Sequence, residues 1–308
     1  MRDSGAEKRF TSPKGDDLAV VWTRGRGCAE LAELLAEGEP NRVAGDVEDE
    51  CINLRADLLV SRRFPGSFEL ISVAVPVDFQ PENVTSVVAT VAGGPHSLLA
   101  AETAAQLGRA LGVEAEMVSA ASPDDGTSAA EEVLEQIGVT IPGLRSRVVE
   151  VEGISELVES LDDGALLVLG APGGSWLQRS MFGPGARLRR TAQAGSVVVR
   201  SAPERVFRFM GDPVYVAPLR QADDTLRFHA ESTLAVADQG RLIGLVRRDR
   251  LAQAGVAPVG DLMEEAMSVR VDETMSQAWA LEPTFGVDPI PVTDHEEHLV
   301  GGLSLPAR

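Results

Sequence analysis

Glycines stand on both sides of a short segment that follows an apolar run in the middle of the chain. The run ALLVLG ends at Gly170, Gly173 and Gly174 come next, and Gly183 and Gly185 precede the basic segment ARLRR. Glycine lets backbone N–H groups approach an anion, and a helix N-terminus adds partial positive charge. The spacing therefore predicts a phosphate-binding loop between a buried strand and a helix.

Other polar side chains could also do chemistry, but none forms a catalytic set. His96 and Ser97 follow the glycine turn at Gly93 and could act as a nucleophile pair, although Ser97 is better placed as a helix cap. His295 and His298 could hold a metal, but they fall in an expected turn without a third ligand. With no nucleophile elbow, acid/base pair or hydride-cofactor motif, the sequence predicts a protein that is not an enzyme.

The elements that must position the glycine loop alternate regularly between residues 81 and 202. Apolar runs predict strands at 85–91, 113–121, 145–151, 165–170 and 196–200, and amphipathic patterns predict helices at 98–112, 129–138, 154–161 and 186–195. Repeated strand and helix pairs favour a parallel sheet covered by helices on both faces. Ligands of such sheets bind at the carboxyl ends of the strands, which is where the glycine loop begins.

The flanking segments have different patterns. Residues 1–80 contain a charged start, a strand and helix unit at 18–38, and further apolar runs at 56–60 and 70–77, which predict a small α/β segment of open attachment. Residues 203–308 contain an internal repeat of roughly 50 residues, visible when FMGDPVYV is aligned with LMEEAMSVRV and LAVADQGRLIGLV with IPVTDHEEHLVGGL. Two such repeats are expected to pack together and share a core.

Composition limits the possible partners. The net charge of −19 and pI of about 4.6 disfavour nucleic acid and anionic lipid as partners. The 28 basic residues include only Lys8 and Lys14 as lysines, which suits either a GC-rich genome or a salt-adapted host. Cys28 and Cys51 have no zinc-type or disulfide spacing, and no apolar run is long enough to span a bilayer. We expect a cytoplasmic protein that does not insert into membranes.

The glycine spacing resembles a known family motif. Gly170-x-x-Gly173-x9-Gly183 is similar to the phosphate loop of the universal stress protein family, and the similarity runs from about residue 84 to residue 200. The resemblance implies a flavodoxin-like α/β fold, often dimeric through its last strand, whose nucleotide-binding members hold ATP. The segment LAVVWTRGRG is similar to the strand and loop junction of the same family, so residues 17–80 could be a reduced second copy.

Two positions depart from the nucleotide-binding pattern. Ala92, before Gly93, stands where those members have an acidic residue, and Pro184 stands where they have a phosphate-binding hydroxyl residue. Losing one charge-assisted and one neutral hydrogen bond costs roughly 2 to 4 kcal/mol of binding free energy. Two interpretations remain: a nucleotide held mainly by backbone groups, or a retained turn without a ligand.

The C-terminal repeat resembles a tandem pair of cystathionine-β-synthase-type (CBS) domains, over about residues 204–305. The resemblance implies a cleft for adenosine ligands such as ATP or AMP, with a Ser or Thr three residues after the hairpin glycine and a ribose-binding Asp three further on. The first repeat has Arg247 and Arg250 at these positions, and the second has Ser304 and Ala307. Arg247 and Ser304 are therefore candidate ligand contacts, although both ribose carboxylates are missing. The arginines could bind phosphate or an acidic partner, or be exposed residues at a helix end.

Taken together, these features predict a non-enzymatic regulatory or stress-response protein that senses an adenine nucleotide through its α/β domain, its CBS-type cleft, or both. The alternative is an interaction scaffold with vestigial pockets, acting as a homodimer or as the soluble regulatory partner of a membrane transporter. Weak ATP hydrolysis is a third interpretation.

Overall fold

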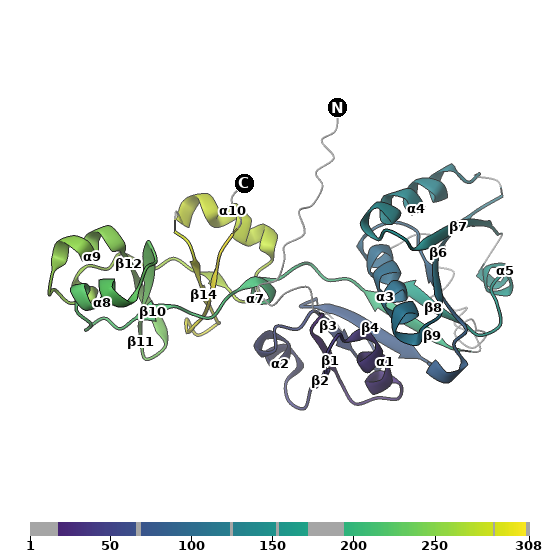
Figure 1. The fold of residues 1–308 in the computed structure, drawn as a ribbon, viewed down its shortest axis with the longest axis horizontal. Helices are drawn as coiled ribbons and strands as arrows, with labels where there is room; N and C mark the ends of the chain where they lie inside the picture. Colours follow the sequence, from purple (N-terminus) through teal and green to yellow (C-terminus); the bar gives the residue numbers. More distant parts are fainter. Residues whose placement is uncertain are drawn as a thin grey trace. The chain divides into compact units, whose positions relative to one another are not determined.

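The computed structural model describes residues 18–65, 69–123, 126–151, 154–171, 194–285 and 287–305. These residues belong to two compact units, one within residues 17–202 and one that begins at Pro203 (Figure 1). Among the described residues, no helix is both long and apolar enough to cross a lipid bilayer. The second unit begins where the strand and helix alternation of the sequence ends.

The first unit is built around one mixed sheet with helices. Its strands are β1 (Val20–Trp22), β2 (Asn41–Arg42), β3 (Leu58–Val60), β4 (Ser72–Val77), β5 (Ser86–Thr90), β6 (Glu114–Ala121), β7 (Arg145–Glu150), β8 (Ala165–Gly170) and β9 (Ser196–Arg200). Its helices are α1 (Cys28–Leu35), α2 (Val47–Asn53), α3 (Pro95–Leu111), α4 (Ser128–Thr140) and α5 (Ile154–Glu159), with a 3₁₀ turn at Pro81–Asn83.

The described strands lie in the order β2-β1-β3-β4-β9-β8-β5-β6-β7. Neighbouring strands are parallel except β4 and β9, which pair antiparallel with Val75 opposite Val198. The strands of residues 81–202 therefore follow the order 3-2-1-4-5, whereas a flavodoxin-like sheet follows 2-1-3-4-5. The α/β class and the parallel-rich sheet agree with the sequence, but the strand order differs, because alternation fixes the element types and not which edge the third strand joins.

The sheet consists of two corresponding halves. The N-terminal half has the strand order β2-β1-β3-β4, and the other half has the corresponding order β6-β5-β8-β9. The first strand of each half, β1 or β5, is therefore an inner strand. The last strands, β4 and β9, meet antiparallel, so an approximate two-fold axis relates the halves. The N-terminal half lacks a counterpart of β7 among the described residues, and residues before 80 share one sheet with those that follow.

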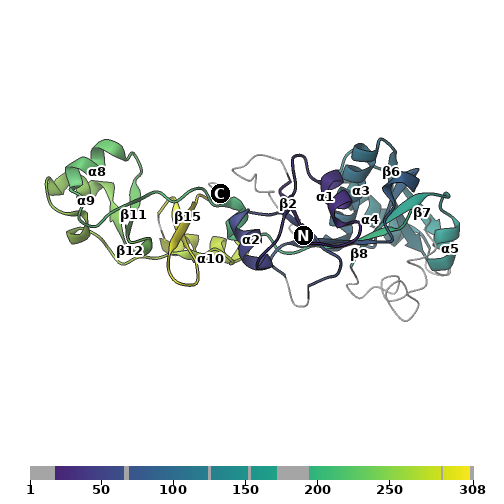
Figure 2. The ribbon, with the colours of Figure 1, turned by 90° about the horizontal axis from the view of Figure 1, so that it is seen from below.

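Helices cover both faces of this sheet. Side chains of α1, α3 and α4, such as Leu31, Leu107 and Leu134, pack with Val87 against one face, whereas Leu157 of α5 packs with Val88 on the other. α1 and α3 are in contact, and the two views agree on this (Figure 1 and Figure 2). Alternate residues of a strand point to opposite faces, so the doubly covered strands are almost wholly apolar, as predicted.

Two glycines define important turns of the first unit. α3 ends at Gly112, whose φ of 68° is left-handed and whose N–H bonds back to the carbonyl of Arg109. Gly195 opens β9 with a φ of 86°, and a Cβ there would overlap the carbonyl of Asp78 at the end of β4. The antiparallel junction of the two halves therefore requires glycine at position 195.

The second unit contains two copies of one motif. Its elements are α7 (Val206–Phe209), β10 (Tyr215–Val216), α8 (Ala222–Phe228), β11 (Thr233–Asp238), β12 (Arg241–Arg247), α9 (Arg248–Ala254), β13 (Val269–Arg270), α10 (Met275–Phe285), β14 (Ile290–Thr293) and β15 (Leu299–Leu303), with a 3₁₀ turn at Val259–Asp261.

Two three-stranded sheets, β10-β11-β12 and β13-β14-β15, repeat the same pairing of one parallel and one antiparallel neighbour. Both hairpins are irregular at corresponding points, after Val236 and after Val292. α8 and α9 lie side by side over the first sheet (Figure 1). The internal repeat predicted from the sequence is therefore confirmed.

Candidate functional site

The first candidate site is the carboxyl edge of β5 and β8. The chain leaves β5 through Gly93 and Gly94, whose φ angles of 89° and 80° are left-handed, and then enters α3. Gly170 ends β8 beside this turn, where a Cβ would stand 3.0 Å from the carbonyl oxygen of His96. Gly93 and Gly170, two of the glycines that the sequence singled out, therefore both lie at this edge.

Two side chains fix the turn after β5. The Ser97 hydroxyl accepts a hydrogen bond from the N–H of Ala92 at 3.0 Å and donates one to the carbonyl of Gly93 at 2.9 Å. His96 Nδ1 accepts from the N–H of Ser201 at 3.0 Å, just beyond β9. Ser97 is thus engaged in closing the turn, but it is not the helix cap that the sequence suggested, because α3 begins at Pro95 and its N-cap Gly94 has no side-chain cap hydrogen bond. His96 ties α3 to the end of β9.

His96 is held in its neutral form. Burial lowers the pKa of its imidazole, and the positive charge of Arg200 lowers it further. A neutral Nδ1 can accept the Ser201 hydrogen bond, whereas a protonated one cannot. This histidine is therefore suited to structural positioning and adds no positive charge that would attract phosphate.

The remaining glycines of the predicted phosphate loop, Gly173, Gly174, Gly183 and Gly185, lie outside the described residues, as does Pro184. Ala92 is exposed at the end of β5 and brings no carboxylate to the edge. The turn from Ala92 to Gly94 therefore offers a ligand backbone groups and no charged side chain.

The second candidate site lies between the two repeats of residues 203–305, which exchange contacts across an approximate two-fold axis. The segment before β10 bonds to β15 of the other repeat, since Gly211 donates to the carbonyl of Gly302 at 2.8 Å. The segment before β13 bonds to β12 in the same manner, since Glu264 donates to Leu245 at 2.7 Å. Each hairpin is therefore completed by a segment of the other repeat.

Two contacts between a glycine and a methionine show most clearly that the two repeats pack on each other in the same way. A Cβ at Gly244 would lie 2.7 Å from Sδ of Met263, and a Cβ at Gly301 would lie 2.7 Å from Sδ of Met210. The sequence alignment had already placed FMGD opposite LMEE, so the two methionines were visible as a repeat. The sequence did not show that each methionine contacts the hairpin glycine of the opposite repeat.

A small cleft opens between the two hairpins, with a cavity volume of about 10 Å³. Both repeats line it: Val214, Glu231, Thr233, Ala235 and Leu245 from the first, and Pro289, Pro291, Leu299, Gly301 and Gly302 from the second. This volume is about that of one water molecule.

Glu231 is the acidic side chain of the cleft. Its Oε2 atom is buried and accepts no hydrogen bond from the described residues, and Nδ1 of His229 lies 3.7 Å from it. A buried carboxylate oxygen without a donor is costly, so this atom is prepared to accept a hydrogen bond from a ligand.

Arg247 and Arg250, which replace the polar residues of the CBS pattern, share one carboxylate. Arg250 lies 2.9 Å from Glu264 Oε1, and Arg247 lies 3.6 Å from Glu264 Oε2. Ser304 is exposed just beyond β15. Glu264 reaches the arginines because its segment crosses to the opposite repeat, a contact that the sequence alone did not indicate.

The described residues contain no group of three side chains placed to hold a metal ion. His298 Nδ1 lies 3.2 Å from Oδ2 of Asp294 within the hairpin turn, so one of the two histidines that were weighed as metal ligands contacts a carboxylate of its own turn. Cys28 and Cys51 are both buried and unpaired, and burial raises the pKa of the Cys51 thiol to about 12. Both thiols are therefore unreactive core residues.

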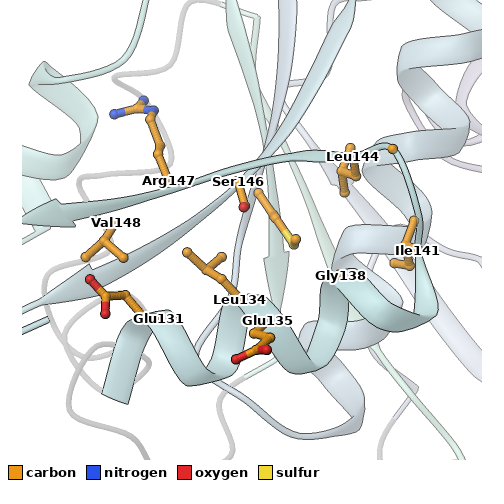
Figure 3. A pocket seen from close by; sticks show the side chains of 11 residues that line it. Glu131, Leu134, Glu135, Gly138, Ile141, Leu144, Ser146, Arg147 and Val148 are labelled. Atoms are coloured by element: carbon orange, nitrogen blue, oxygen red, sulfur yellow. The ribbon is translucent and has the colours of Figure 1, made fainter. Parts of the chain in front are cut away.

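A hollow of about 500 Å³ lies between α4 and β7 (Figure 3). Leu134 points from α4 toward the strand, and Glu131 and Glu135 stand on the helix, while Arg147 points away from the helix and pairs with Glu116. Two carboxylates stand at this hollow, and that of Glu131 accepts a hydrogen bond from Oγ1 of Thr127 at 2.9 Å. The hollow therefore has the character of an edge groove rather than of a site for an anionic ligand.

Comparison with known proteins gives a partial match. No family model matches the chain, and no curated protein matches it. Similar solved structures are CBS domain pairs: the cytosolic domain of the Mg²⁺ channel MgtE in complex with ATP (24% identity, TM-score 0.31), and CBSX2 in complex with AMP (26% identity, TM-score 0.30). A third is a CBS domain pair/ACT domain protein from Thermotoga maritima, with 20% identity and a TM-score of 0.31.

Each of these matches covers 33% of this chain. The match spans 46% of the MgtE chain, 90% of CBSX2 and 89% of the Thermotoga maritima protein.

Proposed function

We propose that this chain is a non-enzymatic regulatory protein that senses an adenine nucleotide in the cleft between its two C-terminal repeats. The observation that carries this proposal is the reciprocal packing of the repeats around a cleft that Glu231 lines, a residue whose buried Oε2 atom accepts no hydrogen bond from the described residues. It agrees with the CBS-type resemblance of the sequence, which implies adenosine ligands.

Ligand binding in this cleft would change the arrangement of the two hairpins. Its volume of about 10 Å³ is far below that of a nucleoside, so a ligand must separate the two hairpins to enter. The lining comes from both repeats, so the open arrangement would be stabilised only while ligand is bound. A binding event that selects between two arrangements of packed elements is the physical requirement for a sensor.

Glu231 gives the cleft its preference for a hydrogen-bond donor. A carboxylate can accept from a ribose hydroxyl or an adenine amino group, and it repels phosphate, which must then lie toward the mouth of the cleft. The turn after β5, at Gly93 and Gly94, offers a second position for a phosphate chain in the α/β unit, where backbone groups would bind it.

Calorimetric titration of the full chain with ATP, ADP and AMP tests the proposal, together with two variants of one position. Glu231→Met removes the acceptor, whereas Glu231→Gln retains an acceptor oxygen. Because a hydrogen bond to a charged group contributes about 1.5 to 3 kcal/mol, the Met variant should bind about tenfold or more weakly, and the Gln variant less so. Absence of heat with all three nucleotides at about 1 mM would refute nucleotide sensing.

The second candidate is an interaction scaffold with vestigial pockets, acting as a homodimer or as the cytoplasmic partner of a membrane transporter. The ion pairs of Arg247 and Arg250 with Glu264 favour the scaffold, because both guanidinium groups that could have bound phosphate already pair with a carboxylate. A stable partner recovered from detergent extracts at equal yield with and without nucleotide would support this candidate. Strictly nucleotide-dependent recovery would count against it.

A further inference from the structure

The N-terminal half of the sheet carries a group of arginines at one edge. Arg24 and Arg26 lie in the loop that joins β1 to α1, and Arg62 and Arg63 follow β3. β1 and β3 are parallel neighbours, so both loops leave the same carboxyl edge. All four side chains are exposed, and we refer to them as the arginine edge.

Direct contacts hold the two loops together. The N–H of Thr23 donates to the carbonyl of Val60 at 3.0 Å, and its hydroxyl donates to Oγ of Ser61 at 3.2 Å. A Cβ at Gly25 would stand 3.1 Å from Cβ of Arg62. The first pair of arginines is therefore fixed beside the second by backbone contacts rather than by chance positions of flexible side chains.

The arginine edge has no acidic partner among the residues that the structure describes. Within the described ranges, none of its four members makes an ion pair or a hydrogen bond, whereas exposed arginines elsewhere, such as Arg145 and Arg241, pair with glutamates. The carboxylate of Glu30 and the guanidinium of Arg62 both act on the pKa of the buried Cys28 thiol, so they share a neighbourhood, yet they form no ion pair. Like charges held close together without a counter-ion are unfavourable in isolation and favour an anionic ligand.

We propose that the arginine edge binds a small oligophosphate, such as a tripolyphosphate or the phosphate chain of a nucleotide. The planar guanidinium group binds phosphate oxygens in pairs of hydrogen bonds, and two adjacent arginine pairs match successive phosphate groups. The loop adds backbone access at Gly25 and at Gly27, whose φ is 74° and which precedes α1 without a side-chain cap.

The corresponding edge of the other half has different chemistry. Where β1 leads to arginines, β5 leads to Ala92, Gly93 and the neutral His96. The two halves share a strand order, so the arginines are a property of one half and not a requirement of the fold. This assignment needs no adenine base and does not depend on the proposed nucleotide cleft.

A small anion fits this edge better than an acidic protein does. Protein interfaces bury apolar side chains at their centre, and none of the large apolar side chains exposed in the described structure falls within residues 18–65. The net charge of −19 also repels an extended polyanion over long distances, while a compact one feels mainly the nearby guanidinium groups.

The test is calorimetric titration of the full chain with sodium tripolyphosphate at low salt, with ATP, AMP and hexaglutamate as parallel ligands. The variants are Arg24→Gln with Arg26→Gln, and Arg62→Gln with Arg63→Gln. The matched control changes two exposed, ion-paired arginines of the other unit, Arg227→Gln with Arg241→Gln, and alters the net charge equally. Thermal unfolding of each variant checks that the fold is retained.

We expect tripolyphosphate and ATP to bind through the same arginines, with each edge variant about 30-fold weaker and the control within about twofold of the parent. AMP binding should not respond to the edge variants, which separates this site from the proposed cleft. Three results would each overturn the proposal: no heat with tripolyphosphate, equal weakening in the control, or hexaglutamate binding as tight as that of tripolyphosphate.

Discussion

Replacing either hairpin glycine of the C-terminal unit by alanine should destabilise that unit. In Gly301→Ala the new Cβ would lie 2.7 Å from Sδ of Met210 and 2.9 Å from the carbonyl oxygen of Gly211. The methionine can rotate away, but the carbonyl belongs to a bridge in which Gly211 and Gly302 exchange hydrogen bonds of 2.8 and 3.2 Å. Relief of the overlap must therefore lengthen this bridge.

The magnitude follows from those contacts. Overpacking of a well-packed site costs about 1 to 3 kcal/mol, and weakening one hydrogen bond adds about 1 kcal/mol. We therefore expect Gly301→Ala to lower the free energy of unfolding by about 2 to 4 kcal/mol. Gly244→Ala should have the same effect, because its Cβ would meet Met263 and Glu264 at the same distances of 2.7 and 2.9 Å.

Urea unfolding followed by the fluorescence of Trp279, in a chain carrying Trp22→Phe and Trp176→Phe, reports on the C-terminal unit. Gly211→Ala is the matched control, since its Cβ would approach the carbonyl oxygen of Gly302 only to 3.7 Å. Its cost should stay below about 1 kcal/mol. Equal losses in the control and in Gly301→Ala, or no loss in either hairpin variant, would refute the reciprocal packing.

Three further predictions concern both units. Gly108 and Gly138 lie in the last turns of α3 and α4, and each can be replaced by alanine. A Cβ at position 108 would lie 2.7 Å from Cβ of Ala115, whereas a Cβ at position 138 would meet only a methionine methyl group at 3.5 Å. The first should therefore lower thermal stability, whereas the second should stabilise by about 0.5 to 1 kcal/mol. Burial lowers the folded-state pKa of His96 below 6.5, so its unfolded form binds more protons as the pH falls below that value. Wild-type stability should then fall more between pH 7.5 and pH 5.5 than that of His96→Gln, and equal falls would contradict this. Glu264→Gln releases the two arginines that it pairs with and should raise the affinity for ATP about tenfold in calorimetry. An unchanged affinity would mean that these arginines do not face a nucleotide.

Periodicity predicted the elements that bury a clear apolar face and missed those that do not. α3 was visible because its alanines and leucines recur at helical spacing and because Gly112 ends it. β2 is two exposed residues, Asn41 and Arg42, that carry no alternation. α2 has the sequence VEDECIN, and its start depends on Asp46, whose carboxylate accepts hydrogen bonds from the next turn. Such elements follow from capping and pairing partners, which periodicity does not report.

The candidate sites were predictable to the extent that they lie within one segment of sequence. Arg247 follows Gly244 by three residues in the sequence, and in the structure it ends β12 opposite Thr233. Its carboxylate partner Glu264 could not be predicted, since the contact depends on the exchange of segments between repeats. Arg24 and Arg62 are likewise far apart in sequence, and they become neighbours only because β1 and β3 pair.

The antiparallel junction of the two halves bears on how copies of this chain could associate. The family resemblance implies dimers formed through the last strand, which here is β9. In this structure β9 is paired on both sides, by β8 and by β4, so neither edge is free for a second copy. β4 occupies the place that a partner's last strand would take, and Gly195 allows its close approach. The first unit therefore already contains, within one chain, the strand pairing that a two-fold dimer would supply. A homodimer of this protein must use another surface, and β9 substitutions should leave its association unchanged.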